Sequence, residues 1–140
     1  MNNEFMNILM DNAYKSLESN DVPIGALIVK NNEIIATGYN TREKNQNILG
    51  HAEINAIITA QAHVNNWNFS GFDLYVTLTP CSMCMEIIKQ CRFDNVFYLL
   101  DKPLSKKEFN KTKVIKINDI KFENEYKKIL SDFFKKMREK

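Results

Sequence analysis

One histidine, one glutamate and two cysteines stand at spacings that suit a mononuclear metal site. The chain reads H-A-E at 51–53 and P-C-S-M-C at 80–84. If a helix begins near Pro80, Cys81 and Cys84 lie on one face of its first turn, where the partial positive charge of the helix end favours thiolate. Imidazole and thiolate are ligands that zinc prefers. The spacing therefore predicts that His51, Cys81 and Cys84 bind one Zn²⁺.

Three protein ligands leave the fourth position of a tetrahedral zinc ion for water, which is typical of a catalytic site. Cys91 follows Cys84 by seven residues, or about 10.5 Å along a continuous helix. His63 follows His51 by twelve residues, or about 18 Å along a helix. Neither side chain closes the site easily, so we expect it to be open.

Glu53 lies two residues after His51, so on a helix it points about 200° away from the histidine. A carboxylate near a metal but not bound to it is suited to moving protons. Zinc lowers the pKa of a bound water to about 7, so Glu53 is the predicted proton carrier. C-x-x-C alone also fits a redox pair or half of a structural zinc site, and His-x-Glu alone fits a solvated helix start. Their joint occurrence, with proline before the first cysteine, favours a zinc hydrolase.

The composition is that of one globular domain spanning residues 1–140, with 44% hydrophobic and 26% charged residues. No apolar run approaches the length of a membrane span, so no membrane association is expected. Residues 1–10 contain Glu4 and no basic residue, which is unlike a signal peptide. Three cysteines do not suggest a disulfide framework. Because the ligands must be free thiolates, a reducing cytoplasm is the expected location.

The net charge of +2 hides a separation of charge along the chain. Residues 1–101 hold 6 Lys/Arg and 11 Asp/Glu, a charge of −5, and residues 102–140 hold 13 and 6, a charge of +7. A basic C-terminal third fits a protein that contacts phosphates. It also fits a solvated lysine-rich helix, so charge alone leaves nucleic-acid binding open.

Hydrophobic periodicity predicts alternating helices and strands, and residues 40–50 are expected to form a polar loop. The predicted helices cover 3–18, 51–61, 81–90 and a C-terminal segment with an apolar stripe from Phe122 to Met137. The predicted strands cover 24–29, 33–38, 72–78, 95–100 and 114–117. This order indicates an α/β fold. Both ligand segments begin helices, so the metal is expected between two helix N-termini at the ends of strands.

Taken together, these motifs resemble the cytidine deaminase-like superfamily and, within it, the bacterial tRNA-specific adenosine deaminases. The resemblance covers most of the chain. The matching blocks are D-V-P-I-G-A at 21–26, Y-N-T-R-E at 39–43, H-A-E-I-N-A-I at 51–57, L-Y-V-T-L at 74–78 followed by P-C-S-M-C at 80–84, and S-D-F-F-K-K-M-R at 131–138. The metal motif marks the superfamily, and the first, second and last blocks point to the tRNA branch.

The resemblance implies a three-layer α/β/α fold, with a central mixed sheet of about five strands and helices on both faces. It implies one Zn²⁺ per subunit of a homodimer, and conversion of adenosine to inosine at the wobble position of a tRNA anticodon loop. The implied substrate-binding residues are Asn40, Ala52, Ile24 and Pro80. The implied RNA-binding residues are Phe133, Phe134 and Arg138.

The chain also departs from the pattern of these deaminases. Thr79 stands where they usually have Glu, and no glycine follows Gly71, although they usually have a Gly-rich loop after the fourth strand. Two other functions therefore stay open. One is deamination of a free nucleobase or nucleoside (guanine, cytosine or cytidine), and the other is a non-catalytic zinc-binding partner subunit.

Overall fold

The computed structural model describes residues 2–102 and 112–139. The segment that replaces the expected Gly-rich loop lies largely outside these residues. In chain order the elements are α1 (Asn3–Ser16), the 3-10 turn η1 (Leu17–Ser19), β1 (Gly25–Lys30), β2 (Glu33–Tyr39), α2 (Arg42–Asn45), α3 (Ala52–Val64), β3 (Asp73–Leu78), α4 (Ser82–Cys91), β4 (Asn95–Leu100), β5 (Lys113–Lys116) and α5 (Ile120–Arg138). No helix within the described ranges combines the length and apolar character needed to cross a membrane.

The five strands form one mixed sheet in the order β2-β1-β3-β4-β5. β1 is antiparallel to both β2 and β3, whereas β3, β4 and β5 are parallel. Gly25 pairs with Tyr39, and Leu78 pairs with Leu100. The C-terminal ends of β2, β3 and β4 therefore meet at the end of the sheet where β1 begins.

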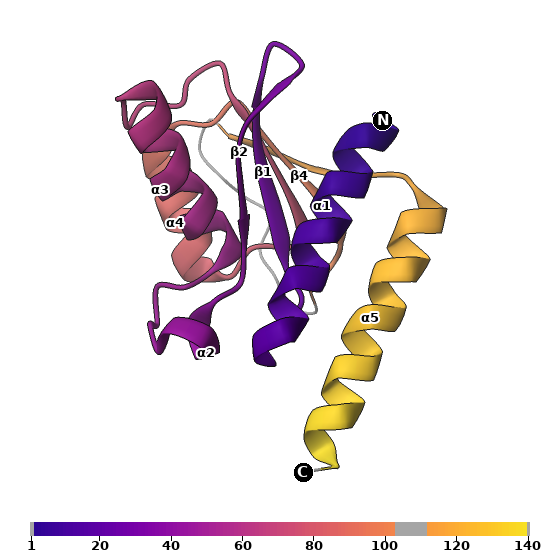
Figure 1. The fold of residues 1–140 in the computed structure, drawn as a ribbon. Helices are drawn as coiled ribbons and strands as arrows, with labels where there is room; N and C mark the ends of the chain where they lie inside the picture. The colour runs from indigo at the N-terminus through magenta and orange to yellow at the C-terminus, as the bar shows by residue number, and fades with distance from the viewer. Residues whose placement is uncertain (1, 103–111, 140) are drawn as a thin grey trace.

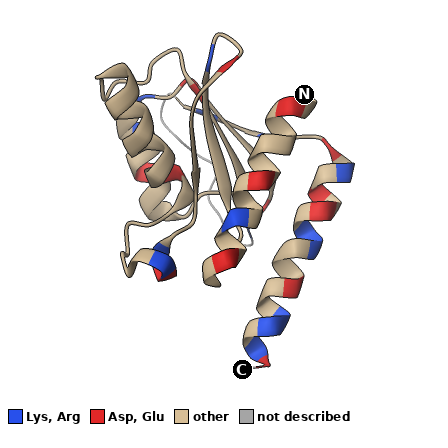
Figure 2. Ribbon diagram, in the orientation of Figure 1, with Lys and Arg blue, Asp and Glu red and all other residues tan. Residues whose placement is uncertain are grey.

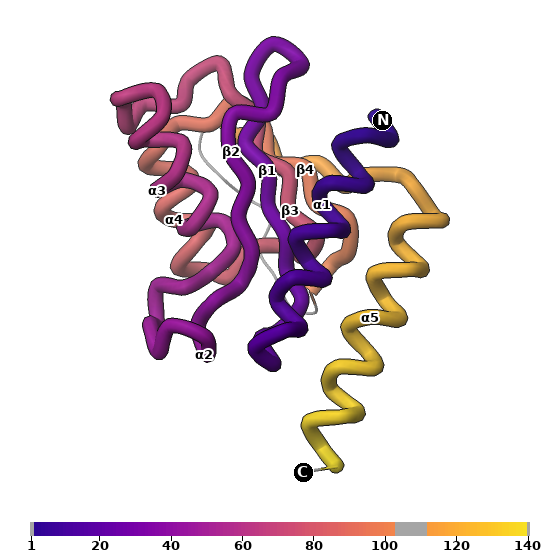
Figure 3. The backbone as a smooth tube through the Cα atoms, in the orientation of Figure 1, coloured from indigo at the N-terminus to yellow at the C-terminus, as the bar shows by residue number. Residues whose placement is uncertain are grey.

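Helices cover both faces of this sheet, which gives the three expected layers (Figures 1 and 3). Side chains of β3 alternate between the faces, as strand geometry requires. Leu74 and Val76 pack in the core under α3 and α4, whereas Tyr75 packs in the core under α1 and α5. The prediction of a mixed α/β/α sandwich is confirmed.

Close packing of α3 on β2 requires a residue without a side chain at position 38. A Cβ atom at Gly38 would lie 2.3 Å from the Ala52 carbonyl oxygen and 2.6 Å from the Ala56 backbone nitrogen. Ala52, Ala56 and Ala60 are fully buried and present only methyl groups to the sheet. These small residues bring the first turn of α3, next to His51, against the edge strand.

The predicted helices and strands are all present, with most bounds within one or two residues of those expected. The structure adds α2, which lies in the segment expected to be a loop. Its N-terminal N–H groups are capped by the buried Asp21, whose carboxylate accepts from Glu43 N at 2.6 Å and from Lys44 N at 3.2 Å. Because the capping residue lies more than twenty residues away in sequence, no local sequence pattern predicted this helix.

Candidate metal centre

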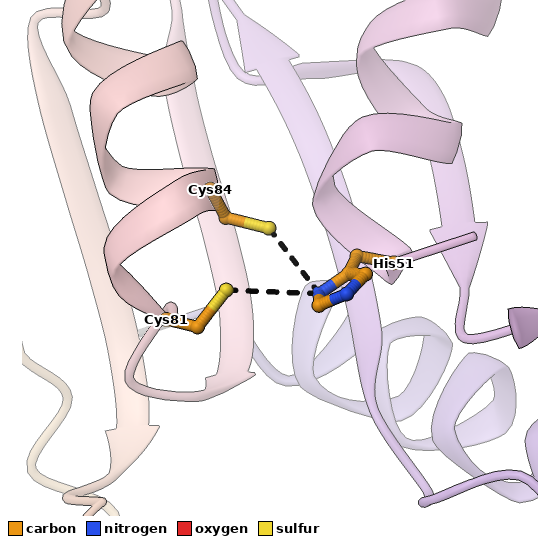
Figure 4. Close-up of side chains that lie close together, drawn as sticks. All are labelled: His51, Cys81 and Cys84. Carbon is orange, nitrogen blue, oxygen red and sulfur yellow. Dashed lines mark hydrogen bonds between the residues drawn. The ribbon is translucent and has the colours of Figure 1, made fainter. Parts of the chain in front are cut away.

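The three predicted ligands come together between the N-terminal ends of α3 and α4 (Figure 4). His51 is the N-cap residue of α3, and Cys81 is the N-cap residue of α4. The His51 Nδ1 atom lies 3.4 Å from the Cys84 Sγ and 3.8 Å from the Cys81 Sγ. Within the described ranges these three residues form the group able to hold a metal, with ligand atoms within 4.8 Å of one another.

These distances fit a tetrahedral zinc ion. Zn–S bonds of about 2.3 Å and Zn–N bonds of about 2.05 Å place neighbouring ligand atoms about 3.6–3.8 Å apart at the tetrahedral angle. The lower value is the expected distance between nitrogen and sulfur. The two observed distances from the His51 Nδ1 to sulfur, 3.4 and 3.8 Å, lie on either side of it. Cys91 is not in the group, because it lies at the C-terminal end of α4 and packs in the hydrophobic core.

The environment of the two cysteines favours a thiolate. The hydrogen bond from the Cys84 thiol lowers the pKa of Cys81 to about 5. Burial opposes this shift, while the backbone N–H groups of Cys84 and Met83 and the His51 ring favour it. The same interaction with Cys81, together with burial, raises the pKa of Cys84. The pair therefore keeps one proton between its sulfur atoms, and a metal ion would displace it.

Glu53 is buried beside this group, with 3% of its surface exposed. Glu53 belongs to the first turn of α3, and its carboxyl group forms a hydrogen bond with the Cys84 thiol. Burial is the main cause that raises the pKa of Glu53 to about 7, and the charge of Cys81 adds to it. A carboxyl group with this pKa can both accept and donate a proton near neutral pH, as a proton carrier requires.

The predicted substrate-binding residues surround the same end of the sheet. Asn40 follows β2 and is held on both sides of its amide: Nδ2 donates to the Val22 carbonyl at 3.2 Å, and Oδ1 accepts from Arg42 N at 3.3 Å. The backbone of Asn40 donates to the Ile24 carbonyl at 3.1 Å. Pro80 is buried directly before the first cysteine ligand. Contact of these residues with a substrate stays a prediction.

Ala52 opens α3, and the side chain of the N-cap His51 makes no capping hydrogen bond to this helix. The Glu53 carboxyl group interacts with its own backbone N–H, whereas the His51 side chain leaves the N–H groups at the start of α3 free to donate to a bound base. This arrangement is compatible with the predicted backbone contact at Ala52, which also stays a prediction.

The predicted RNA-binding residues are distributed unequally on α5. Phe133 is only 8% exposed and lines a pocket with Tyr14 and Leu17, whereas Phe134 is 44% exposed and Arg138 is exposed. The two phenylalanine rings meet edge to face at 5.3 Å. Of these three residues, only Phe134 and Arg138 are therefore exposed to a partner in this structure.

Two residues near Glu53 were not predicted to have a role. The charge of Lys102 acts on Glu53 and lowers its pKa. Lys102 is held by its backbone N–H, which donates to the Thr79 hydroxyl at 3.1 Å. Thr79 in turn donates to the Leu100 carbonyl at 3.1 Å. In the sequence, Thr79 was distinguished only because the tRNA-specific adenosine deaminases usually have Glu at this position. No sequence motif indicated a role for Lys102.

A family profile described as MafB19-like deaminase matches residues 1–138. The chain belongs to this deaminase family. This deaminase is 34% identical over 145 residues to a protein named tRNA-specific adenosine deaminase in Aquifex aeolicus, and that alignment covers 96% of this chain and 94% of the relative. The match over nearly the full length of both proteins also places it in the family of the tRNA-specific adenosine deaminases.

Other relatives of the deaminase are matched over part of their length. A protein of the same name from Streptococcus pyogenes is 43% identical over 94 residues, which is 67% of this chain. The match spans only 59% of the streptococcal protein's length.

Two solved structures have the same fold as this chain and are identical to it at more than a quarter of the aligned residues. One comes from a study of A-to-I editing by tRNA:A34 deaminases at the wobble position of transfer RNA. It has a TM-score of 0.75, 28% identity, and covers 82% of this chain and 98% of that chain. The other is a guanine deaminase from Bacillus subtilis, with a TM-score of 0.66 and 32% identity over 72% of this chain and 66% of that one.

Proposed function

We propose that this chain is a zinc-dependent deaminase that converts adenosine to inosine at the wobble position of a tRNA anticodon loop. The proposal rests on one arrangement: a group of one histidine and two cysteines beside a buried carboxyl group, in a chain similar over 96% of its length to a tRNA-specific adenosine deaminase. In this proposal residues 1–140 form a single catalytic domain, which acts as a homodimer with one Zn²⁺ per subunit.

His51, Cys81 and Cys84 would hold the zinc ion, which would supply a water of lowered pKa as nucleophile at neutral pH. Glu53 would take a proton from the water that attacks C6 of the adenine ring and deliver it to ring nitrogen N1. As the C6–N6 bond breaks, Glu53 would help to protonate the leaving amine. One water is consumed, and ammonia and inosine are formed. The raised pKa of Glu53 suits both transfers.

The base must leave its stack to reach the buried carboxyl group. An anticodon loop is single-stranded, so its bases can be extruded at lower cost than bases in a duplex. Asn40, Ala52, Ile24 and Pro80 would line the path of the extruded nucleoside, while Phe134 and Arg138 on α5 would contact the RNA. Phe133 would support this contact from the buried side of the helix.

The test is ammonia release and inosine formation by the zinc-loaded protein on an anticodon stem-loop RNA with a wobble adenosine. Free adenosine, cytidine and guanine are assayed beside it. We expect release from the RNA, and a loss of at least about 100-fold in kcat for Glu53→Gln with zinc retained, since general acid–base catalysis contributes about 10²–10⁴-fold. Full turnover by Glu53→Gln would refute the assigned role.

The similarity to the B. subtilis guanine deaminase makes deamination of a free base the second candidate function. Ammonia release from guanine that is indifferent to added RNA would establish it and refute the tRNA proposal. Stoichiometric zinc without ammonia release from any of these substrates would favour the non-catalytic partner subunit.

A further inference from the structure

A polar groove of about 340 Å³ lies on the edge of the sheet between α1, β2 and α3. We call it the edge groove, and the residues used below are Lys15 of α1, Tyr39 of β2, Thr41 and Lys44 after β2, and Asn55 of α3. Among the described residues that line it, none is acidic. We propose that the edge groove binds the phosphodiester backbone of the RNA beside the nucleotide that enters the metal centre. This inference rests on the proposed function.

Two lysines converge on one aromatic ring in this groove. The Lys15 ammonium lies 5.9 Å and the Lys44 ammonium 5.6 Å from the centre of the Tyr39 ring. Lys44 also donates to the Tyr39 hydroxyl at 3.3 Å. Neither ammonium forms an ion pair with any residue that the structure describes. Two ammonium groups held together, with neither of them paired to a carboxylate, create a local positive potential that attracts an anion.

The edge groove adjoins the metal centre through Asn55. The Asn55 side-chain amide donates to the Tyr39 carbonyl at 2.8 Å and to the Thr41 hydroxyl at 2.9 Å. The Asn55 backbone N–H donates to the carbonyl of the ligand His51 at 2.9 Å. Tyr39 and Thr41 flank Asn40, which is the predicted contact of the target nucleoside. A nucleotide held at Asn40 therefore leaves its neighbours in the chain beside the groove.

Charge identifies the class of ligand. Residues 1–101 carry a net charge of −5, so a groove with two lysines and no carboxylate differs from the rest of this part of the chain. Figure 2 shows one basic segment on α1, with acidic segments before and after it, and basic and acidic segments together on α2. Lysine and amide side chains are typical contacts for phosphate and sugar, which position a nucleic acid without reading its sequence. The backbone of a single-stranded RNA loop that passes the metal centre presents these phosphate and sugar groups.

The experiment compares the zinc-loaded protein with a Lys15→Ala/Lys44→Ala variant and with Lys30→Ala as the matched control. Lys30 also lies over an aromatic ring, 4.7 Å from the centre of Phe72, but at the opposite end of β1. The measurements are Kd for the anticodon stem-loop RNA at several salt concentrations, KM and kcat on that RNA, and turnover of free adenosine. Thermal unfolding and sedimentation of the RNA-free proteins accompany them.

We expect the double variant to bind the RNA about 10-fold more weakly at low salt. We also expect the slope of log Kd against log salt to fall by about 1 to 2, roughly one for each lost phosphate contact. KM should rise with kcat nearly unchanged, and free adenosine turnover and thermal unfolding should not change. Lys30→Ala should behave as the wild type in every measurement.

RNA binding by the edge groove is refuted if the double variant keeps the wild-type Kd and the wild-type slope of log Kd against log salt. A changed sedimentation coefficient with unchanged RNA affinity refutes it too, in favour of a contact between subunits. Failure of the proposed function looks different, because then the wild type itself releases no ammonia from RNA. A wild type that binds the RNA without deaminating it still tests the groove through Kd, and one that does not bind RNA refutes both.

Discussion

At the scale of single residues, the chemistry depends on how burial sets the protonation of Glu53. The carboxyl group is buried beside the sulfur atoms of Cys81 and Cys84, and this position raises its pKa to about 7. A proton carrier for neutral pH gains from this shift, but the folded protein loses stability whenever the group is ionised in its buried position. In the proposed mechanism, the pKa that suits Glu53 to proton transfer therefore comes at a cost to the stability of the fold.

We expect Glu53→Gln to flatten the pH dependence of stability in the metal-free protein. The folded pKa of about 7 exceeds the ordinary 4.5, so the stability that Glu53 contributes is complete below about pH 4.5 and is lost as pH rises through 7. Between pH 5 and pH 8 the free energy of unfolding should fall by up to about 3 kcal/mol more in the wild type than in the variant. Urea unfolding with chelator present measures the free energy of unfolding of both proteins across this pH range. If that free energy changed with pH equally in both, the raised pKa of Glu53 would be contradicted.

Among the three cysteines, only two are expected to affect metal content. Cys84→Ala should lose the stoichiometric zinc because it removes one of three ligands, whereas Cys91→Ala should keep one zinc per chain. Cys91 packs in the core and is 7% exposed, so its replacement should cost about 1–2 kcal/mol of stability instead. Metal analysis after dialysis checks this, and loss of zinc in Cys91→Ala would contradict the assigned ligand set.

At the scale of elements, the metal centre depends on two helix starts and on the packing of α3 against β2. His51 lies before α3 and Cys81 before α4, so the ligand geometry follows the placement of these helices on the sheet. α3 can approach β2 closely because Gly38 faces the Ala52 and Ala56 backbone. The position of the histidine is therefore tied to a glycine thirteen residues before it.

Replacement of that glycine should disturb both the fold and the metal. Gly38→Ala places a methyl group 2.3 Å from a backbone oxygen of α3, which must shift, so we expect a loss of about 3 kcal/mol or more and weaker zinc binding. Gly71→Ala is the control. It meets no atom within 4 Å but has φ +88°, so it should cost only about 1 kcal/mol and leave zinc binding intact. Equal effects of the two variants on zinc affinity would contradict the packing explanation.

At the scale of the whole molecule, the residues assigned to metal and RNA binding gather at one end of the sheet. α2 lies at the end of the sheet where β2, β3 and β4 finish (Figure 1). The metal centre and the edge groove lie at the same end, because His51 and Cys81 precede α3 and α4 and because Thr41 and Lys44 follow β2. Basic residues also stand in the last turn of α5: Lys135, Lys136 and Arg138. The opposite end holds the β1–β2 turn and Lys30. An RNA bound at the metal centre would therefore meet positive charge on more than one layer.

Zinc should also stabilise the whole domain, because its ligands come from two helices packed on the same sheet. A ligand at 1,000 times its Kd that binds only the folded state adds about 4 kcal/mol. We therefore expect chelation to lower the midpoint of thermal unfolding of the wild type by several degrees, and readdition of zinc to restore it. Cys84→Ala should show no such shift, and an equal response in that variant would point to metal bound elsewhere.

The amino-acid sequence by itself was sufficient to predict which three side chains come together at the candidate metal centre, and nearly every helix and strand. The reason is that these features are local. Thiols three residues apart after a proline, alternation in the strands and apolar stripes in the helices each depend on neighbours in the chain. The three-layer fold and the adenosine deaminase family followed from the resemblance of these blocks. The structure confirmed the fold, and the similarity to full-length relatives confirmed the family.

Only the tertiary structure decided what depends on residues distant in sequence. α2 exists because Asp21 caps it from beyond the β1–β2 hairpin. The apolar stripe of α5 contained two neighbouring phenylalanines, and the position of α5 beside α1 decided that Phe133 is buried while Phe134 is exposed. Lys15 and Lys44 meet at one ring because α1 and the segment after β2 lie side by side. Each of these outcomes is a long-range contact, and a sequence pattern reports only the preferences of nearby residues.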